Sequence, residues 1–168
     1  MIRADLFRHA PKDRRGRVSP SGKVIAQVEF ARYIASMQTK ELGAIRLSTS
    51  PINRALLSIA ILRRALWQKT GKKQPFVVDE RLSESDQLDE FIVGTYGEDS
   101  QPYVWAHPLL EFITRPHDGK VKTGREMASD VSSWFKENLS SDSEGHCLSI
   151  GMGHGPSILF FILAIQQK

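Results

Sequence analysis

Short apolar runs alternate along this chain with longer segments whose apolar residues recur at helical spacing. The short runs are only a few residues long, and polar or glycine-rich sequence follows each of them, which favours buried β-strands. Four such runs stand out: Ala4–Phe7, Ala44–Ser48, Phe76–Val78 and Cys147–Ile150. The pattern therefore predicts four strands separated by helical connections.

The first helical segment begins at Ser19-Pro20, because Ser19 can cap a helix and Pro20 suits its first turn. Apolar residues recur at helical spacing as far as about Lys40: Val24, Val28, Ala31, Ile34 and Ala35. The second segment opens at Ser50-Pro51 and ends at Gly71. One face of it is apolar: Ala55, Ile59, Leu62 and Leu66.

Two further helices are predicted in the second half of the chain, at 124–139 and 156–166. The first of them has an apolar face made of Met127, Val131, Trp134 and Phe135. Strands that alternate with helices of this length indicate an α/β fold, a three-layer α/β/α sandwich with a mostly parallel central sheet. We expect a single domain over 1–168, with an irregular active-site insertion around 80–122, where glycines, prolines and aromatics are scattered.

The net charge of +4 is unevenly distributed over the 168 residues. Residues 1–23 are strongly basic, and 79–99 are strongly acidic. A basic end attracts anions, either phosphate esters or nucleic acid, although a solvated basic loop is the equally simple interpretation. A single cysteine, no signal-peptide pattern and no apolar run of membrane-spanning length predict a soluble, cytoplasmic protein with no membrane partner.

Two arginines and two histidines follow the predicted strands. Arg8 and His9 come after the first strand, Arg54 lies in the helix after the second, and His154 follows the last within a glycine-rich stretch. Because ligands bind beyond the carboxyl ends of strands in such sheets, we expect these side chains to converge on one edge.

Six motifs, in this order, make the chain similar to the histidine phosphatase superfamily, also called phosphoglycerate-mutase-like. They resemble the family's Arg-His-Gly opening, the turn into the first helix, the Ser-Ser-Pro-x-x-Arg-Ala segment, the Arg-Leu-x-Glu element, the start of a later helix and the Thr-His-Gly ending. The matching segments are Leu6–Ala10, Val18–Ala26, Ser48–Ala55, Arg81–Glu84, Gly124–Glu126 and Leu148–Gly155. Each motif is weak alone, whereas the ordered set covers nearly the whole chain.

The resemblance implies a role for each residue. His9 would attack phosphorus from its neutral form and become a phosphohistidine, and Glu84 would protonate the leaving oxygen. Arg8, Arg54 and a protonated His154 would bind the phosphoryl oxygens, which fits a reaction that depends on positioning and electrostatic stabilisation. No cofactor and no metal are implied.

Further phosphate contacts are expected from the amide of Gly155, at the start of the last helix, and from Arg15. The second of these rests on a departure from the family pattern, because Ala10-Pro11 replaces a glycine and a small polar residue after the catalytic histidine. Mutases of the family carry a phosphate-binding asparagine further along this loop, where Arg15 is the candidate substitute. Asp79, Glu80 and Asp86 lie close enough in sequence to compete with Glu84 for the acid role.

The sequence thus predicts a metal-independent, histidine acid phosphatase-type enzyme that hydrolyses a phosphomonoester or phosphoprotein through His9. Two alternatives stay open: a phosphoglycerate-mutase-type phosphotransferase, and a catalytically weak relative that binds a phosphorylated ligand. Nucleic acid is not expected as a partner, because no recognised module and no interleaved aromatics accompany the basic loop. Relatives continue beyond the last helix into further edge strands, so a homodimer that covers this edge is possible.

Overall fold

In the computed structural model, described for residues 2–13, 17–84, 121–139 and 148–166, the centre of the protein is a four-stranded parallel sheet. Its strands are β1 (Arg3–Arg8), β2 (Ile45–Thr49), β3 (Phe76–Val78) and β4 (Leu148–Gly153). They lie in the order β1-β4-β2-β3, so the first and last strands of the described chain are neighbours. All four predicted strands are present, and every pairing between them is parallel.

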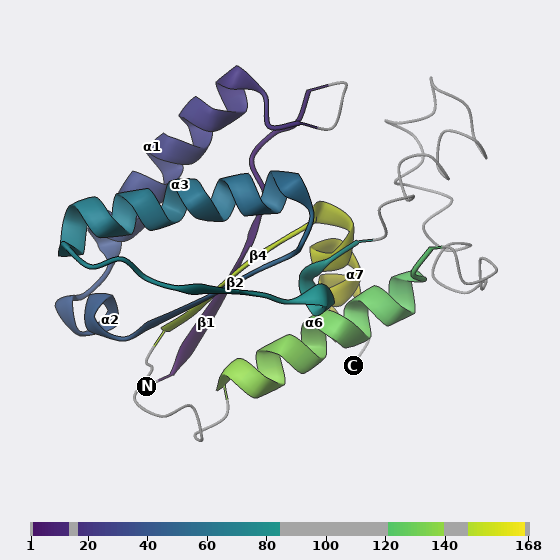
Figure 1. Cartoon of the computed structure of the whole chain (residues 1–168). Helices are drawn as coiled ribbons and strands as arrows, with labels where there is room; N and C mark the ends of the chain where they lie inside the picture. Colours follow the sequence, from purple (N-terminus) through teal and green to yellow (C-terminus); the bar gives the residue numbers. More distant parts are fainter. Residues whose placement is uncertain (1, 14–16, 85–120, 140–147, 167–168) are drawn as a thin grey trace.

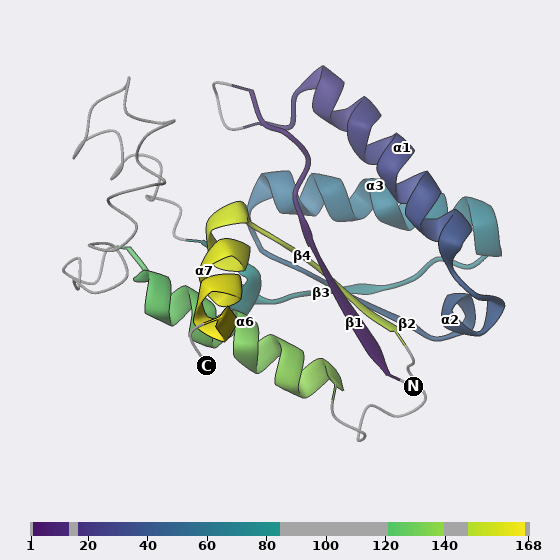
Figure 2. The same cartoon turned by 180° about the vertical axis from the view of Figure 1, so that it is seen from behind.

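Helices cover both faces of this sheet (Figures 1 and 2). On one face lie α1 (Pro20–Ser36), the short α2 (Thr39–Gly43) and α3 (Asn53–Thr70), and on the other lie α6 (Gly124–Leu139) and α7 (Gly155–Gln166). A 3₁₀ turn, η1 (Glu80–Leu82), follows β3. The three-layer α/β/α sandwich predicted from the sequence is therefore confirmed.

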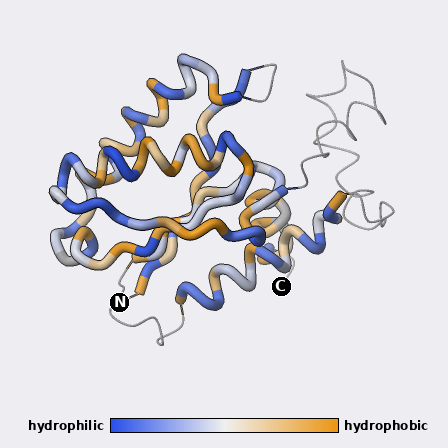
Figure 3. The backbone as a smooth tube through the Cα atoms, in the orientation of Figure 1, coloured by the Kyte–Doolittle hydropathy of each residue, from blue (hydrophilic) through white to orange (hydrophobic). Residues whose placement is uncertain are grey.

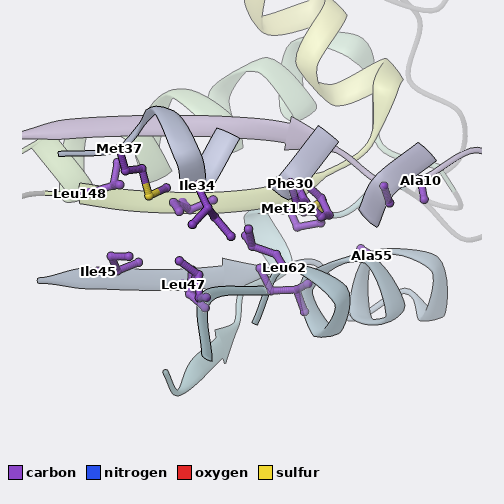
Figure 4. Close-up of a cluster of buried hydrophobic side chains, with 14 of the residues drawn as sticks. Ala10, Phe30, Ile34, Met37, Ile45, Leu47, Ala55, Leu62, Leu148 and Met152 are labelled. Carbon is purple, nitrogen blue, oxygen red and sulfur yellow. The ribbon is translucent and has the colours of Figure 1, made fainter. Parts of the chain in front are cut away.

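The main core lies between the sheet and the helices α1 and α3 (Figure 4). The strands contribute Leu47 and Ile150, which are almost wholly buried, and α1 contributes Phe30 and Ile34. The predicted apolar face of α3 is confirmed, since Ala55, Ile59, Leu62 and Leu66 are all inaccessible to solvent. Figure 3 shows the resulting alternation of apolar and polar residues along this helix.

A second apolar layer lies between the sheet and α6. Met127, Val131 and Trp134 are fully buried there, while Phe135 is half-buried and stacks on Phe161 of α7 with ring centroids 5.0 Å apart. The Trp134 ring lies directly against the backbone of β4: a Cβ added to Gly151 would be only 2.8 Å from it. The absence of a side chain at Gly151 therefore allows the helix layer to approach the sheet closely.

The first helix differs from its predicted course in two respects. It ends at Ser36, where Met37 adopts an extended conformation, and Gln38 then caps a separate short helix by reciprocal bonding with Glu41. Of the five apolar residues that predicted this helix, only Ile34 is buried. The face that packs against the core instead carries Gly22, Ala26, Phe30 and Ile34, a strict repeat of four.

Other element ends shift by a few residues. The helix α3 begins at Asn53, not at Ser50-Pro51, because Ser50 still bonds to the neighbouring strand: its amide donates to the carbonyl of Met152 at 3.0 Å. Strand β4 extends to Gly153, three residues beyond the predicted end. Cys147 and most of the expected insertion at 80–122 lie outside the described residues. Among the described helices, none is both long and apolar enough to span a bilayer.

Candidate active site

The carboxyl ends of β1, β2 and β4 deliver three polar segments to the same edge of the sheet. The amide of His9 donates to the Gly153 carbonyl at 3.0 Å, which continues the pairing of β1 with β4 by one residue. Ser50, which follows β2, bonds to the opposite edge of β4, since its amide donates to the Met152 carbonyl. His9 and Ser50 therefore start from backbone positions that the sheet itself fixes, and His154 directly follows the last residue of β4.

His9 is buried, with 6% of its surface exposed, and both ring nitrogens are engaged. Nδ1 lies 2.6 Å from the carbonyl oxygen of Ala10. Because a carbonyl oxygen only accepts, Nδ1 carries the proton and donates it. Nε2 then holds the free electron pair of the neutral ring, and it accepts a hydrogen bond from Arg54 Nε at 3.1 Å. The nitrogen that faces Arg54 is thus the nucleophilic one.

The surroundings of His9 disfavour its protonated form. The pKa of the imidazole falls from 6.5 to about 4, chiefly because the ring is buried; positive charge on His154, Arg54 and Arg8 also lowers it, and the hydrogen bond to the Ala10 carbonyl opposes the change. At neutral pH the ring is therefore uncharged, which is the form that can act as a nucleophile.

His154 faces His9 across the site, with ring centroids 5.0 Å apart. Its Nε2 lies 3.0 Å from the hydroxyl oxygen of Ser50. Its Nδ1 lies 3.3 Å from both Arg54 Nε and an oxygen of Glu84. Nδ1 can accept from the arginine when the ring is neutral and donate to an anion when it is protonated. The ring is fully buried, and these two contacts place Nδ1 towards Arg54 and Glu84.

Glu84 reaches the same cluster from the loop after η1. Its side chain is almost completely buried and forms an ion pair with Arg54 in addition to its contact with His154. The competing acid Asp79 is occupied elsewhere, because Arg81 binds both of its oxygens, at 2.9 and 2.6 Å. Although burial raises the pKa of Asp79, these bonds to Arg81 outweigh it and hold that pKa below the ordinary value. Asp86 lies outside the described residues.

Arg8 approaches the site from the last position of β1 and lies across Gly155, the first residue of α7. A Cβ at Gly155 would be 3.1 Å from Arg8 Nε and 3.2 Å from its Cζ. The absence of a side chain at Gly155 therefore leaves room for the guanidinium group. Arg8 and Gly155, both predicted phosphate ligands, are therefore next to each other. Arg15, the other candidate in the basic loop, lies outside the described residues.

Sequence reasoning did not single out two buried serines of this cluster. Ser50 contacts His154, and Ser58 accepts a hydrogen bond from the amide of Ala10 at 2.9 Å. Ser58 is completely buried on the apolar face of α3. A polar residue on such a face requires a hydrogen-bonding partner, and this was the signal that could have identified it.

The cluster combines a neutral imidazole nucleophile, arginines, a second histidine and a buried carboxylate. In the described part of the chain, no group of three or more His, Cys, Asp or Glu side chains could hold a metal ion. Arginine and protonated histidine can instead bind and neutralise the oxygens of a phosphate. A carboxyl group within the same cluster can exchange a proton with a leaving group or with water.

No protein-family model and no curated protein matches this sequence. Solved structures do resemble it. A mycobacterial glucosyl-3-phosphoglycerate phosphatase is 16% identical with a TM-score of 0.61, over 97% of this chain and 78% of the other. A phosphoglycerate mutase from Bacillus anthracis is 11% identical with a TM-score of 0.68, over 98% and 79%.

A third similar structure is a phosphoserine phosphatase variant from Entamoeba histolytica in complex with phosphoserine, 15% identical with a TM-score of 0.59, over 99% of this chain and 81% of the other. At these identities the likeness concerns the fold. The chain has the fold of these phosphatases and of phosphoglycerate mutase, and the phosphoglycerate-mutase-like architecture predicted from its sequence is confirmed.

Proposed function

We propose that this protein is a histidine phosphatase, which hydrolyses a phosphomonoester or a phosphoprotein through a phosphohistidine on His9. The observation that carries the proposal is the state of His9: Nδ1 is held by the Ala10 carbonyl, and Nε2 is unprotonated and directed at Arg54. The similar structures include phosphatases, one of which is a complex with phosphoserine, and they support the same class of reaction.

The first step forms a bond between His9 Nε2 and phosphorus while the bond from phosphorus to the ester oxygen breaks. Arg8, Arg54 and protonated His154 bind the phosphoryl oxygens and offset the charge that develops on them. Glu84, in its protonated form, gives its proton to the departing oxygen.

In the second step the Glu84 carboxylate takes a proton from a water molecule, which attacks the phosphohistidine. The bond from phosphorus to nitrogen breaks and returns the electron pair to Nε2. Inorganic phosphate leaves, and both His9 and Glu84 are back in their starting forms. For the first step Glu84 leaves its ion pair with Arg54 when the phosphate oxygens take Arg54 as their partner. A buried carboxyl group without a counter-charge favours its neutral form, so Glu84 takes up the proton that it then donates.

The substrate is expected to be strongly anionic, because basic residues concentrate near the N-terminus and in the loop after His9. A phosphotransferase of the mutase type is the second candidate, since a phosphoglycerate mutase is among the similar structures. The phosphotransferase mechanism differs in one step only: the phosphoryl group on His9 is transferred to a bound acceptor instead of to water.

The proposal is tested by hydrolysis of para-nitrophenyl phosphate in the presence of EDTA. We expect turnover by the wild type, none by His9→Ala, and a loss of at least about 10²-fold for Arg54→Gln, which removes a charge that stabilises the transition state. Arg64→Gln is the matched control, because Arg64 lies on the same helix but is exposed to solvent. It should retain wild-type activity.

A wild-type protein that folds, binds inorganic phosphate and turns over no phosphate ester would contradict the enzymatic proposal and favour the phospholigand-binding alternative. The mutase alternative is separated by adding an alcohol acceptor, such as a phosphoglycerate. In that case the label from ³²P-phosphohistidine would appear in the acceptor rather than in inorganic phosphate.

A further inference from the structure

A closed ring of hydrogen bonds joins the helix that carries Arg54 to the loop that carries His9. The Ser58 hydroxyl donates to the Arg54 carbonyl at 2.7 Å and accepts from the Ala10 amide at 2.9 Å. The Ala10 carbonyl accepts from His9 Nδ1 at 2.6 Å. Arg54 Nε closes the ring by donating to His9 Nε2 at 3.1 Å. Each member of the ring thus constrains the orientation of the imidazole.

Within this ring, Ser58 is the link between the helix and the loop. Its hydroxyl has one proton to donate and uses it on the helix, so its oxygen is available as the acceptor for the Ala10 amide. Both residues are buried, with 5% of Ala10 and none of Ser58 exposed. Water therefore cannot replace the hydroxyl without a rearrangement of the loop, and an unpaired amide at this depth would shift to find another acceptor.

The residue after Ala10 further restricts the conformation of this loop. Pro11 restricts the backbone of Ala10 to extended conformations and provides no amide of its own. With its amide bound to Ser58 and its conformation limited by Pro11, Ala10 presents its carbonyl to His9 Nδ1 in one direction. Ala10-Pro11 therefore limits the backbone conformations open to this loop, and the hydrogen bond to the Ser58 hydroxyl fixes the position of Ala10.

We infer that Ser58 is a positioning residue, which holds the Ala10 carbonyl against His9 Nδ1 and thereby keeps Nε2 as the unprotonated, reactive nitrogen. The effect of Ser58 on activity rests on the proposed function, because only a His9 that reacts needs to be held in one tautomer. The tautomer itself can be observed without any substrate, so the two can be tested separately.

The experiment compares Ser58→Ala with the wild type by two-dimensional ¹H–¹⁵N spectroscopy of the histidine rings at pH 7, with the His9 signals assigned from His9→Ala. In the wild type we expect His9 to be protonated at Nδ1 alone. In Ser58→Ala the Nε2-protonated tautomer should appear, and kcat/KM for para-nitrophenyl phosphate should fall roughly 10–100-fold, the loss typical of groups that orient a functional histidine through its other nitrogen. Ser58→Thr, which keeps the hydroxyl, should restore both.

Thr70→Ala is the matched control. Thr70 lies on the same helix and its hydroxyl donates to the carbonyl four residues earlier, at 2.8 Å, as the Ser58 hydroxyl does, but at the opposite end of α3. It should leave the His9 tautomer and the activity unchanged. The inference is overturned if Ser58→Ala retains the Nδ1 tautomer, or if Thr70→Ala shows the same loss. A wild type with no activity but with the expected tautomer and its change in Ser58→Ala would contradict the proposed function and leave the inference standing.

Discussion

At the scale of single residues, the site depends on the charge state of His9. The imidazole lies in a buried position beside three groups that carry or can carry positive charge, and its pKa falls to about 4. The depressed pKa keeps this imidazole neutral throughout the range in which an ordinary histidine, with a pKa near 6.5, would become charged.

We therefore predict that the ¹³Cε1 signal of His9 titrates with a midpoint near 4 rather than 6.5. Because the unfolded chain has the ordinary pKa, unfolding takes up a proton between these two values. The contribution of His9 to the free energy of unfolding is then constant above about pH 6.5 and decreases as the pH falls towards 4. A His9→Asn variant should lack this part of the acid dependence in urea titrations. A midpoint above 6 would contradict the prediction.

A second prediction at this scale concerns Glu84. If its carboxyl group protonates the leaving oxygen, Glu84→Gln should reduce kcat for a poor leaving group such as the serine of phosphoserine by about 10²–10⁴-fold. The loss for para-nitrophenyl phosphate should be much smaller, because its leaving group needs little protonation. Glu80→Gln serves as the control. An equal loss for both substrates would assign Glu84 to the positioning of Arg54 instead of to proton transfer.

Much of this site could be predicted from the sequence, because the ordered motifs specify which residue follows which strand. His9, Arg54, His154 and Glu84 all lie in one cluster. The two serines were missed because their importance lies in contacts across the chain, between Ser58 and Ala10 and between Ser50 and His154. The pattern marks Ser58 as a polar residue on an apolar helix face, but it does not say which group the hydroxyl binds.

At the scale of elements, the start of α1 links secondary structure to the site. The hydroxyl oxygen of Ser19 accepts from the amide of Gly22 at 2.9 Å and donates to the carbonyl of Pro11 at 3.3 Å. One side chain thus caps the helix and anchors the loop that follows His9.

Replacement of Ser19 by alanine should lower the free energy of unfolding by about 0.5–2 kcal/mol, the usual cost of a lost N-cap. Ser19→Thr, which can cap the helix in the same way, should be close to the wild type. The measurement is urea denaturation followed by circular dichroism at 222 nm. Equal stability of the alanine and threonine variants would show that the cap contributes nothing.

The elements also show where sequence patterns fail. The valines of α1 recur at helical spacing, yet Val24 and Val28 are 59% and 43% exposed. The buried face begins with the small residues Gly22 and Ala26 and continues with larger ones, because the start of α1 lies against the backbone of Pro11 in the loop after His9 and the helix packs against α3. Hydrophobicity alone does not distinguish a residue that packs at such a crossing from one beside it, so the helix could be predicted and its orientation could not.

At the scale of the whole molecule, the sheet and the α6 layer are in close contact at β4. A Cβ at Gly151 would lie 2.8 Å from the Trp134 ring and 2.9 Å from a methyl group of Leu6, so three elements meet at this point. The Leu6 methyl group can rotate away, whereas the fully buried Trp134 ring cannot yield without moving α6.

Gly151→Ala should therefore destabilise the protein by about 1–3 kcal/mol, the usual cost of overpacking a core. Gly43→Ala is the control, since a Cβ at Gly43 meets nothing within 4 Å. Differential scanning calorimetry of the two variants provides the comparison. A Gly151→Ala protein as stable as the wild type would mean that the α6 layer can move away from the sheet without cost.

The strand order has a consequence for synthesis on the ribosome. β1 leads directly into His9, yet its described neighbour in the sheet is β4, which is separated from it by most of the chain. A nascent polypeptide that has emerged as far as α3 already contains His9 and Arg54, but it lacks His154 and leaves open the edge of β1 that pairs with β4. Such an intermediate lacks part of the proposed site and is prone to associate through its open strand, so the late arrival of β4 both protects the chain from aggregation and completes the cluster.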